Sequence, residues 1–568
     1  MRRAPVTAAV GLALVLHGLW WALVANGGGD LAAQDAWAGF ARAHPLSAYD
    51  LAWYGGMHPG SYSVLSPYVM AVLGVRPTMV VAGVVASGLL ARLIVQTRTI
   101  RHPVLPALYG AIAIWGNAVS GRVTFGLGLM FGLAALVVVF SPSGPSRSPG
   151  RQAWRGLLAA LLAALATLAS PVAGLFLGVV AAALWLSGRR RTAYAVGLPP
   201  VAVVLVASLL FPFSGEQPMK PVTAILPLLI GLCCALMPPP AWHTVRRGAA
   251  FYTAGVVVVL LVPSQIGSNV TRLALIFGGV VLVAVAAEHL AVARRAGVAV
   301  VAAVLVATVW QAGVATADVV NTRSASAWSA GEVAPLVREL RAHDAEVTRV
   351  EVVPTRSHRE ASALAPYVNL ARGWNRQADA ARNRLFYSDD DALDAGSYRR
   401  WLDRWGVRFV LLPHPEPDPA ALAEAELIKG GLPYLHLVWA GAGGRLYEVV
   451  HPTPLVAGPA VVTTFAAGEI VVVVPEPGSY RLRVLSSPWL ALLDPDGHTV
   501  PAPTARGEDS LPVNTNGCLD REEEPATVES GKLDWAVLEA PHAGTYRIST
   551  PYAVPRGTAC PAVTASQR

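Results

Sequence analysis

The sequence has little charge for its length. Charged residues make up 14% of its 568 residues, whereas 54% are hydrophobic and the mean hydropathy is +0.47. A soluble domain averages about 25% charged residues, so this shortage excludes a chain that is soluble throughout. The composition becomes that of an ordinary soluble protein only from Asp318 onward. The sequence therefore divides into an apolar first part and a water-exposed second part.

Cysteines and familiar enzyme motifs are also scarce. The chain has 4 cysteines, and no Cys/His spacing matches a metal site. Cys233 and Cys234 lie in an apolar run and are expected to pack as small hydrophobes. Cys518 and Cys560 lie in the second part, where a disulfide and two free thiols are both compatible with the sequence. The second part contains no GxGxxG, P-loop or nucleophile-elbow motif.

The net charge of +8 does not indicate a nucleic-acid partner. Arginines cluster where apolar runs meet, as at Arg189–Arg191, Arg246-Arg247 and Arg294-Arg295. This is the positive-inside pattern of membrane proteins, and no basic face interleaved with aromatic residues is present. We therefore expect a multi-pass protein of the cell membrane, in contact with membrane lipids and not with nucleic acid.

The long apolar runs predict about eleven membrane crossings. The first, Pro5–Asn26, is interpreted as an uncleaved anchor whose N-terminus lies in the cytoplasm. Gly156–Leu186 is too long for one crossing and is interrupted at Ser170-Pro171, which predicts two. The others are predicted at Val75–Gln96, Pro103–Gly121, Val123–Phe140, Tyr194–Phe213, Val222–Met237, Ala249–Val262, Leu273–Val292 and Gly297–Ala317. This count places the arginine clusters in the cytoplasm and the second part of the chain outside.

The predicted fold is a polytopic α-helical membrane protein with two extracytoplasmic domains. We expect a transmembrane domain over residues 1–317 with an outer loop at 27–67, an α/β domain over 318–452, and a small β-sandwich-like domain over 453–568. Val347–Pro354 and Val407–Pro413 read as buried strands of the α/β domain. Short strands between Gly and Pro turns indicate the sandwich. His358–Glu360 and Ala371–Trp374 are interpreted either as solvated loops or as a lid or acceptor-recognition surface.

The outer loop is the first candidate functional site, because it carries carboxylates that a simple connection does not need. Asp30 lies four residues beyond the first crossing. It is expected to cap a helix over Leu31–Ala43, and a carboxylate there is also suited to act as a general base toward a sugar hydroxyl or to bind a divalent metal. Asp35 is expected on the solvated face of that helix, and Asp50 is expected to cap a turn or contact a ligand.

Aromatic residues and a histidine follow in the same loop. Trp53 and Tyr54 are a candidate stacking platform for a sugar or a prenyl chain. His58 is a candidate phosphate or sugar contact, with a simple turn before the next helix as the alternative.

Two arginines depart from the cytoplasmic bias. Arg122 and Arg272 fall on the outer side, and Arg272 follows Asn269 in the run Gly267–Leu273. An arginine at membrane depth is costly unless it is paired, and its guanidinium suits phosphate. We therefore interpret Asn269 and both arginines as candidate substrate ligands, with snorkelling of the arginines to the interface as the alternative.

Six segments carry a family resemblance: Gly27–Gln34, Trp53–Pro67, Gly121–Leu129, Gly267–Leu273, Ala371–Asp379 and Arg384–Tyr387. Through them the chain is similar to a group of actinobacterial polytopic integral membrane proteins. Its order of one helix, a long acidic outer loop, many helices and an outer domain resembles the GT-C superfamily of membrane glycosyltransferases. The resemblance implies a polyprenyl-phosphate-linked sugar as donor and an envelope glycan as acceptor. It also implies a first-loop acid, here Asp30, that serves the acceptor or a metal, although the paired-acid motif of better-known members is missing.

Our leading hypothesis is an inverting glycosyl transfer at the outer face, with Asp30 as the catalytic residue. A transporter is the first alternative, although the odd number of crossings and the lack of two equivalent halves disfavour it. A non-catalytic envelope scaffold is the second, although eleven crossings exceed what an anchor requires.

Overall fold

The chain forms two compact units, which the computed structural model describes over residues 3–141, 149–213, 215–289, 294–387, 393–505, 511–513 and 516–561. The membrane unit comprises Met1–Asn26 and Gly60–Asn321, and the sheet unit comprises Gly27–Pro59 and Thr322–Arg568. Most of the predicted outer loop therefore belongs to the sheet unit rather than to the membrane domain.

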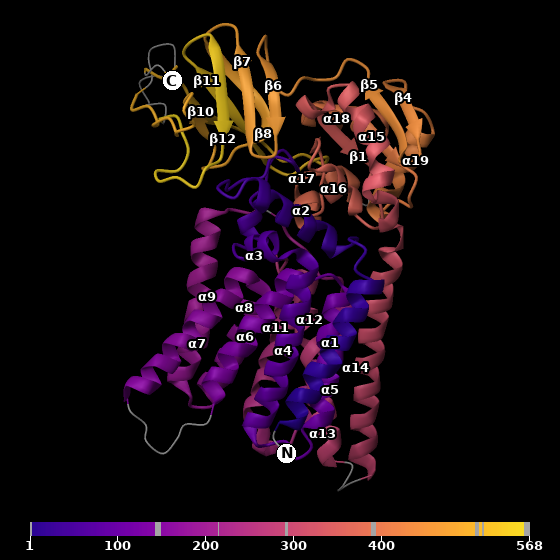
Figure 1. The fold of residues 1–568 in the computed structure, drawn as a ribbon, viewed down its shortest axis with the longest axis vertical. Coiled ribbons are helices and arrows are strands. Elements are labelled where there is room, and N and C mark those ends of the chain that lie inside the picture. Colours follow the sequence, from indigo (N-terminus) through magenta and orange to yellow (C-terminus); the bar gives the residue numbers. More distant parts are fainter. Residues whose placement is uncertain are drawn as a thin grey trace. The chain divides into compact units, whose positions relative to one another are not determined.

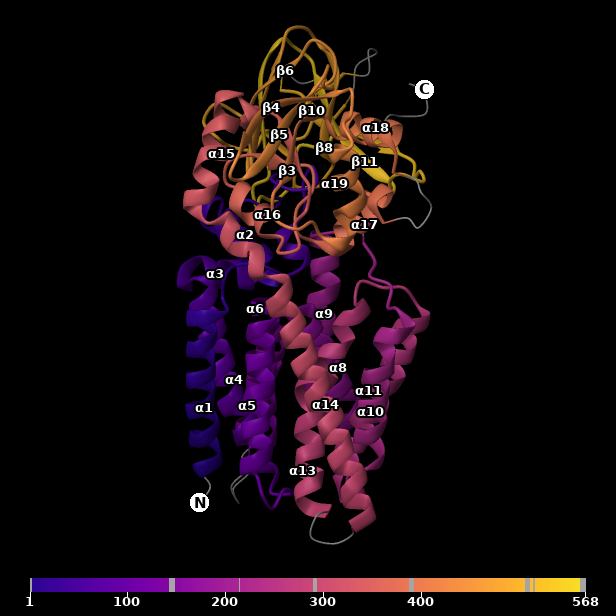
Figure 2. The same cartoon turned by 90° about the vertical axis from the view of Figure 1, so that its right-hand side faces the viewer.

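The membrane unit is a bundle of helices that run roughly along one direction (Figures 1 and 2). Within the described residues, eight helical segments are long and apolar enough to cross a membrane, and three apolar helices are shorter. The long segments overlap α1 (Ala4–Leu23), α4 (Val75–Thr97), α6 (Val123–Phe140), α7 (Pro149–Ala169), α9 (Arg190–Leu210), α11 (His243–Leu261), α13 (Gly279–His289) and α14 (Arg294–Asn321). The shorter helices are α5 (Val104–Val119), α8 (Pro171–Leu186) and α10 (Pro221–Leu236), and α3 (Ser66–Leu73) precedes α4.

These helices are consistent with the predicted crossings. The interruption at Ser170-Pro171 separates α7 from α8, because proline cannot continue the hydrogen bonding of the preceding helix. The crossing predicted to start at Leu273 begins earlier, with short helical turns from Gly267. Its predicted end at Val292 lies outside the described residues.

Arginines cap helix ends at one end of the bundle. Arg155 donates to backbone carbonyls at the C-terminal end of α6, Arg246 to one in the last turn of α10, and Arg247 to the last carbonyl of α8. The final carbonyls of a helix lack partners within the helix and carry the negative end of its dipole. These arginines therefore stabilise helix ends as well as matching the positive-inside pattern.

The sheet unit contains a five-stranded mixed sheet in the order β2-β1-β3-β5-β4. Its strands are β1 (Arg349–Val352), β2 (Asn369–Leu370), β3 (Val407–Pro413), β4 (Leu435–Gly441) and β5 (Gly444–Val449). β1 pairs in parallel with β2 and β3, while β5 pairs antiparallel with β3 and β4. The helices of this module are α15 (Ala330–Ala342), α16 (Arg359–Leu364), α17 (Arg376–Arg382), α18 (Ala395–Trp405) and α19 (Leu422–Lys429). The structure thus contains the α/β module that the sequence indicated.

Two further sheets form a sandwich nearer the C-terminus, with strand orders β10-β11-β8 and β6-β7-β12-β9. The strands are β6 (Val461–Ala466), β7 (Glu469–Val474), β8 (Gly478–Leu485), β9 (Ala491–Leu493), β10 (Cys518–Glu524), β11 (Leu533–Ala540) and β12 (Gly544–Ser549). Inward-facing residues of both sheets share one apolar core. A disulfide joins Cys518 to Cys560, which resolves the alternative that the sequence left open.

The segment 27–59 is built into this unit as a structural element. It begins with α2 (Asp30–Ala43). Tyr49 and Leu51 enter the core of the sandwich, and Trp53 pairs in parallel with Leu370 at the edge of the five-stranded sheet. The prediction of a loop belonging to the membrane domain is therefore wrong for residues 27–59. Large aromatic side chains gain most by burial, and the sheets supply the apolar surface that these rings require.

Candidate functional site

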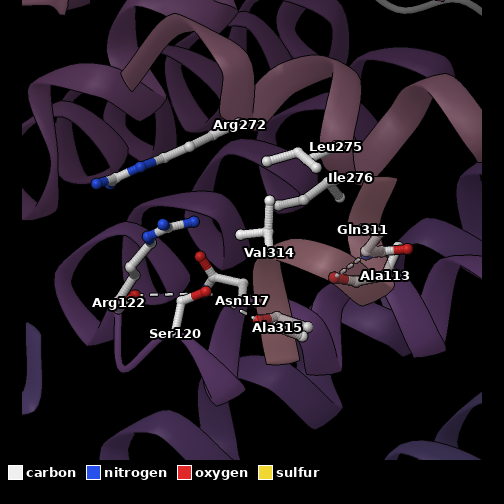
Figure 3. Close-up of a pocket in the computed structure, with 11 residues that line it drawn as sticks. Ala113, Asn117, Ser120, Arg122, Arg272, Leu275, Ile276, Gln311, Val314 and Ala315 are labelled. Atoms are coloured by element: carbon white, nitrogen blue, oxygen red, sulfur yellow. Dashed lines mark hydrogen bonds between the residues drawn. The ribbon is translucent and has the colours of Figure 1, made fainter. Parts of the chain in front are cut away.

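A small polar cavity lies in the membrane unit between α5, α6, α14 and the helical turns that precede α13. Its polar lining consists of Asn117, Ser120, Arg122, Arg272 and Gln311, and the remaining lining is apolar. Figure 3 shows the two guanidinium groups on the same side of this cavity. Its volume of about 20 Å³ is sufficient for about one water molecule. The structure therefore brings Arg122 and Arg272 to one cavity. Their predicted role as substrate ligands stays a prediction.

A tight turn positions Arg122. Helix α5 ends at Val119, Gly121 has a φ of 71°, and Arg122 is the residue immediately before α6. Asn117 Nδ2 donates a hydrogen bond of 3.2 Å to the Arg122 carbonyl, which fixes the turn. Arg122 consequently lies at the N-terminal end of an 18-residue helix, where free N–H groups and the helix dipole favour an anion.

An irregular helix positions Arg272. The residue lies in α12 (Thr271–Leu273), between the 3₁₀ turn η3 (Gly267–Val270) and the π-helical segment η4 (Ala274–Gly278). A π segment changes the direction of the side chains beside it and is common at functional sites. Arg272 is only 8% exposed, and its guanidinium lies 5.3 Å from the centre of the Phe125 ring.

Arg272 Nη1 is buried without a hydrogen-bond partner in the part of the chain that the structure describes. The same holds for Asn117 Oδ1 and for Thr124 Oγ1 in the first turn of α6. Buried polar atoms are nearly always hydrogen-bonded, and an unsatisfied one costs about 1–3 kcal/mol or more if charged. Three such atoms on adjoining segments indicate that a polar ligand or ordered water belongs here.

Helix α14 adds an acid that the sequence analysis missed. Ser120 Oγ donates a hydrogen bond of 2.5 Å to Asp318 Oδ2, and Arg122 Nη2 lies 3.8 Å from the same oxygen. Seven residues before Asp318 on α14, Gln311 Nε2 donates a hydrogen bond of 3.1 Å to the Ala113 carbonyl of α5. The composition predicts that the soluble part begins at Asp318, whereas α14 continues to Asn321. The available signal was the seven-residue spacing of Gln311 and Asp318, which places both on one face of a helix.

A second, apolar cavity of about 350 Å³ lies among α4, α6, α8, α10, α11 and α13. Its lining includes both Phe125 and Phe140, which are about 22 Å apart along α6 at 1.5 Å per residue. Phe125 therefore lines the apolar cavity and also lies beneath the Arg272 guanidinium. Leu273, the next residue after Arg272, lines the apolar cavity as well. Polar and apolar cavities thus meet at Phe125 and the Arg272-Leu273 pair.

Asp30 lies in the sheet unit, at the first position of α2. The predicted cap is displaced by one residue, because Gly29 is the N-cap, with a φ of 62° and its N–H bonded to the Ser357 carbonyl at 2.7 Å. The Asp30 side chain is half-buried, and the positive end of the helix dipole stabilises a carboxylate there. Its catalytic role stays a prediction.

Trp53 and Tyr54 do not form a stacking platform, which corrects the prediction. Both side chains are fully buried. Trp53 Nε1 donates to the Ala361 carbonyl at 3.1 Å, and Tyr54 Oη donates to the Gly373 carbonyl at 2.7 Å. Tyr54 Oη also accepts the Asn375 N–H at 3.0 Å. These rings anchor segment 27–59 to the α/β module and present no free face to a sugar.

His58 and Asn269 also have structural partners. His58 is buried, with Nδ1 3.1 Å from the Ala48 carbonyl and Nε2 3.3 Å from Ser487 Oγ. Burial lowers the pKa of His58 to about 4, so the ring is neutral at physiological pH. Its contact with phosphate or sugar stays a prediction. Asn269 Nδ2 donates to Gln217 Oε1 at 3.3 Å and does not line the polar cavity.

The remaining acids of segment 27–59 are structural too. Asp35, expected on a solvated face, forms an ion pair with Arg359 Nη1 at 2.5 Å. Asp50 Oδ1 accepts a hydrogen bond of 2.9 Å from the Ala52 N–H and so caps a turn. Capping of a turn was one of the two roles expected for Asp50. Burial raises the pKa of Asp50 to about 7.

The polar motifs of the α/β module form buried networks instead of solvated loops. The His358 ring stacks on Trp374 with centroids 3.4 Å apart, and His358 Nε2 lies 3.2 Å from Asp418 Oδ2. Deeper in the module, Arg372 pairs with both Glu351 and Glu424. The signal that the sequence analysis missed is Glu351 itself, a carboxylate in strand β1, whose four residues are all buried.

The structure gives no support for a metal at Asp30. Over the described ranges, three His, Cys, Asp or Glu side chains gather at ligand distance at one place, namely Asp494, Asp496 and His498. These residues belong to a short turn in which the Asp494 N–H bonds to the His498 carbonyl, and two of the three are exposed. Asp30 does not belong to this group of three.

Comparisons with known proteins give one domain match and several structural neighbours. Residues 457–565 match a family model described as "Domain of unknown function (DUF8823)", which covers β6 to β12. No curated protein sequence matches the chain.

Among solved structures, the chain is similar to the archaeal oligosaccharyltransferase AglB from Archaeoglobus fulgidus, in complex with an inhibitory peptide and a dolichol-phosphate. The TM-score is 0.48 and the identity 11%, over 78% of this chain and 74% of that one. The arabinofuranosyltransferase AftD from Mycobacteria gives a TM-score of 0.45 and 12% identity, over 96% of this chain and 61% of that chain's length. ArnT from Cupriavidus metallidurans, bound to undecaprenyl phosphate, gives 0.41 and 14%, over 79% and 98%. These neighbours are GT-C glycosyltransferases, and at such TM-scores and identities none of their residue roles is transferred to this chain.

Proposed function

We propose that this protein is a membrane glycosyltransferase that takes a sugar from a lipid-phosphate carrier and transfers it to an envelope glycan. The observation that carries the proposal is the buried Nη1 of Arg272, which has no hydrogen-bond partner among the described residues and lies in the same cavity as Arg122. A buried guanidinium retained without its full set of partners is expensive. An anion that completes those hydrogen bonds accounts for its position.

Phosphate is the anion that fits best. A guanidinium binds phosphate oxygens through parallel N–H donors, and charge-assisted bonds of this kind are the stronger ones. The N-terminus of α6 supplies additional positive potential at Arg122. A phosphate group is larger than the cavity of about 20 Å³, so its binding requires displacement of water and movement of the partly exposed Arg122 side chain.

The apolar cavity supplies a place for the lipid part of such a carrier. Its walls are almost entirely apolar, and it extends along α6 from Phe125, which contacts Arg272, to Phe140. A phosphate at Arg272 and a prenyl chain in the apolar cavity would therefore be joined at Phe125. A small soluble anion would not require this second cavity.

Asp30 is the proposed general base. In the transfer, the acceptor oxygen forms a bond to the anomeric carbon while the bond from that carbon to the carrier phosphate breaks. The acceptor proton passes to Asp30, and the leaving group is the lipid phosphate. Its place on α2, in a segment joined at both ends to the membrane unit, supports this assignment.

We further propose that the N-terminus is cytoplasmic and the sheet unit extracytoplasmic. The Cys518–Cys560 disulfide supports this orientation, because disulfides persist in oxidising compartments. The arginine clusters support it through the positive-inside rule.

Carrier binding tests the proposal directly. Radiolabelled undecaprenyl phosphate would be titrated against the purified full-length protein in lipid nanodiscs. Arg272→Gln is expected to weaken binding by about 10- to 100-fold, since a hydrogen bond to a charged group is worth about 1.5–3 kcal/mol. Arg190→Gln is the matched control, because Arg190 stacks on Trp185 and lies outside both cavities. Wild-type affinity in a folded Arg272→Gln protein would overturn the proposal.

A second experiment tests the chemistry. Membranes containing the protein would be supplied with radiolabelled polyprenyl-phosphate sugars, and the label entering envelope glycan would be counted. Asp30→Asn is expected to bind carrier but lose transfer, whereas Glu332→Gln, at a first-turn acid of α15 in the same unit, is expected to keep both. Undiminished transfer by Asp30→Asn would refute its role as base. Movement of substrate into sealed vesicles without any change in glycan would favour a transporter instead.

A further inference from the structure

Asp318 and a bound phosphate would compete for the same arginine. Asp318 Oδ2 is held by Ser120 at 2.5 Å and lies 3.8 Å from Arg122 Nη2. We propose that Asp318 is a positioning residue that pairs with Arg122 after transfer and thereby speeds release of the spent lipid phosphate. This inference rests on the proposed function of the Arg122 and Arg272 cavity.

The position of Asp318 on its helix is unfavourable for a carboxylate. It lies in the last turn of α14, which ends at Asn321 and has no basic residue in that turn. The C-terminal end of a helix carries negative potential, so an acid there is destabilised. The compensation comes from α5 and the turn after it, through the Ser120 hydroxyl and the Arg122 guanidinium. Because Asp318 lies at the unfavourable end of the helix dipole, a contribution to the stability of the fold does not explain its position well. Its electrostatic effect on Arg122, a candidate ligand of the phosphate, explains the position better.

The distances suit a pair that forms and breaks. The contact from Ser120 is a short hydrogen bond, which fixes the carboxylate on α14. The contact from Arg122 at 3.8 Å exceeds hydrogen-bond length, so it is mainly electrostatic. Arg122 can therefore move toward a phosphate without loss of a direct hydrogen bond to Asp318, and it can return when the phosphate leaves.

The charges of substrate and product explain why such a device is needed. A sugar linked to a lipid phosphate is a phosphodiester with one negative charge. After transfer the lipid phosphate is a monoester, whose second ionisation lies near about pH 6, so that most of it carries two charges at neutral pH. Two arginines alone would hold this product more tightly than the donor. A fixed carboxylate repels a doubly charged ligand about twice as strongly as a singly charged one.

A purely structural role for Asp318 predicts different results. Gln311 already joins α14 to α5 through the Ala113 carbonyl, so the docking of α14 does not depend on Asp318 alone. Asp318→Asn keeps an oxygen that can accept from Ser120 and removes only the charge. Ser120→Ala removes the hydrogen bond and keeps the charge. The two variants therefore separate charge from packing.

The test is a comparison of two ligands on the full-length protein in nanodiscs: undecaprenyl phosphate and its methyl phosphodiester. We expect Asp318→Asn to tighten monoester binding by about tenfold and diester binding by about threefold at neutral pH. The difference should vanish near about pH 5, where the monoester carries one charge. Ser120→Ala should leave the monoester-to-diester ratio unchanged, and Asp318→Glu should restore the wild-type ratio.

The possible failures can be told apart. If Arg272→Gln and Arg122→Gln both bind undecaprenyl phosphate as the wild type does, the proposed function fails. If those variants weaken binding but Asp318→Asn leaves the ligand ratio unchanged, only the role of Asp318 is overturned. In an Arg122→Gln background, Asp318→Asn is expected to have a smaller effect, and an undiminished effect would contradict action through Arg122.

Discussion

Replacement of Arg372 by methionine should strongly destabilise the sheet unit. Arg372 Nη2 pairs with Glu351 and with Glu424, both of which are fully buried, and its guanidinium lies 3.9 Å from the centre of the Phe386 ring. Methionine would retain much of the packing but leave two buried carboxyls without their cation. Removal of one partner of a buried ion pair costs about 3–5 kcal/mol. At about 2–4 °C per kcal/mol for a unit of this size, the melting temperature should fall by roughly 6–20 °C.

The loss should depend on pH with a definite sign. Burial raises the pKa of Glu351 and of Glu424, and removal of Arg372 takes away the charge that opposes this shift. An acid whose folded pKa is raised favours folding while it is protonated, and that contribution is lost as pH rises through the folded pKa. The penalty of Arg372→Met should therefore be smaller at about pH 5 than at about pH 8.

The measurement is thermal unfolding of the full-length protein, followed by tryptophan fluorescence. Arg356→Met is the matched control, because Arg356 belongs to the same module and pairs with Glu416 at the surface, where an ion pair contributes about 0–1 kcal/mol. Glu351→Gln and Glu424→Gln added to Arg372→Met should recover part of the loss. Equal melting temperatures for Arg356→Met and Arg372→Met would refute the reasoning.

Three further predictions concern the sheet unit. Burial lowers the pKa of His58 to about 4. The contribution of neutral His58 to the free energy of unfolding is therefore complete above about pH 6.5 and declines as the pH falls toward 4. His58→Gln should remove this pH-dependent loss. Burial raises the pKa of Asp50 to about 7. Asp50→Asn should therefore stabilise the fold at about pH 8 and not at about pH 4. Equal stabilisation at both pH values would contradict the burial argument. Replacement of Cys518 and Cys560 by serine opens a loop with a sequence separation of 42. The free energy of unfolding, measured by chemical denaturation, should fall by about 4 kcal/mol. An unchanged free energy of unfolding after reduction of the wild type would show that the disulfide does not constrain the unfolded chain.

The sequence predicted the secondary structure well because the patterns are strong and local. Twenty-residue apolar runs are long enough to show hydropathy clearly, and the proline at Pro171 divides the longest run where the structure does. The buried strand Val407–Pro413 was predicted with the bounds that the structure has, since a strand covered on both faces is mostly apolar.

The sequence did not predict where segment 27–59 belongs. Its position between two membrane helices suggested a loop of the membrane domain, but chain order does not specify which core accepts a side chain. Trp53 and Tyr54 read as exposed binding residues because their partners are backbone groups at Ala361, Gly373 and Asn375, more than 300 residues away. Every residue has a backbone carbonyl, so the amino-acid types in the sequence do not predict which carbonyls these side chains bind.

The buried arginines Arg372 and Arg272 differ in the partners of their guanidinium groups. Arg372 satisfies its charge with Glu351 and Glu424, so its removal harms the fold. Arg272 is almost as buried but has Nη1 without a partner among the described residues, and its contact is the Phe125 ring. Arg272→Met removes an unsatisfied donor that costs about 1–3 kcal/mol and loses a cation–π contact of about the same size.

The two Arg→Met substitutions should therefore give opposite outcomes. The melting temperature of the carrier-free protein should stay within about 2–3 °C of the wild type or rise for Arg272→Met, whereas Arg372→Met lowers it. Added undecaprenyl phosphate should raise the melting temperature of the membrane unit in the wild type and in Arg372→Met, but not in Arg272→Met, because only a ligand that binds the folded state stabilises it. A loss of stability in Arg272→Met as large as that in Arg372→Met would show that Arg272 is satisfied within the fold, and the reason for assigning a phosphate to it would disappear.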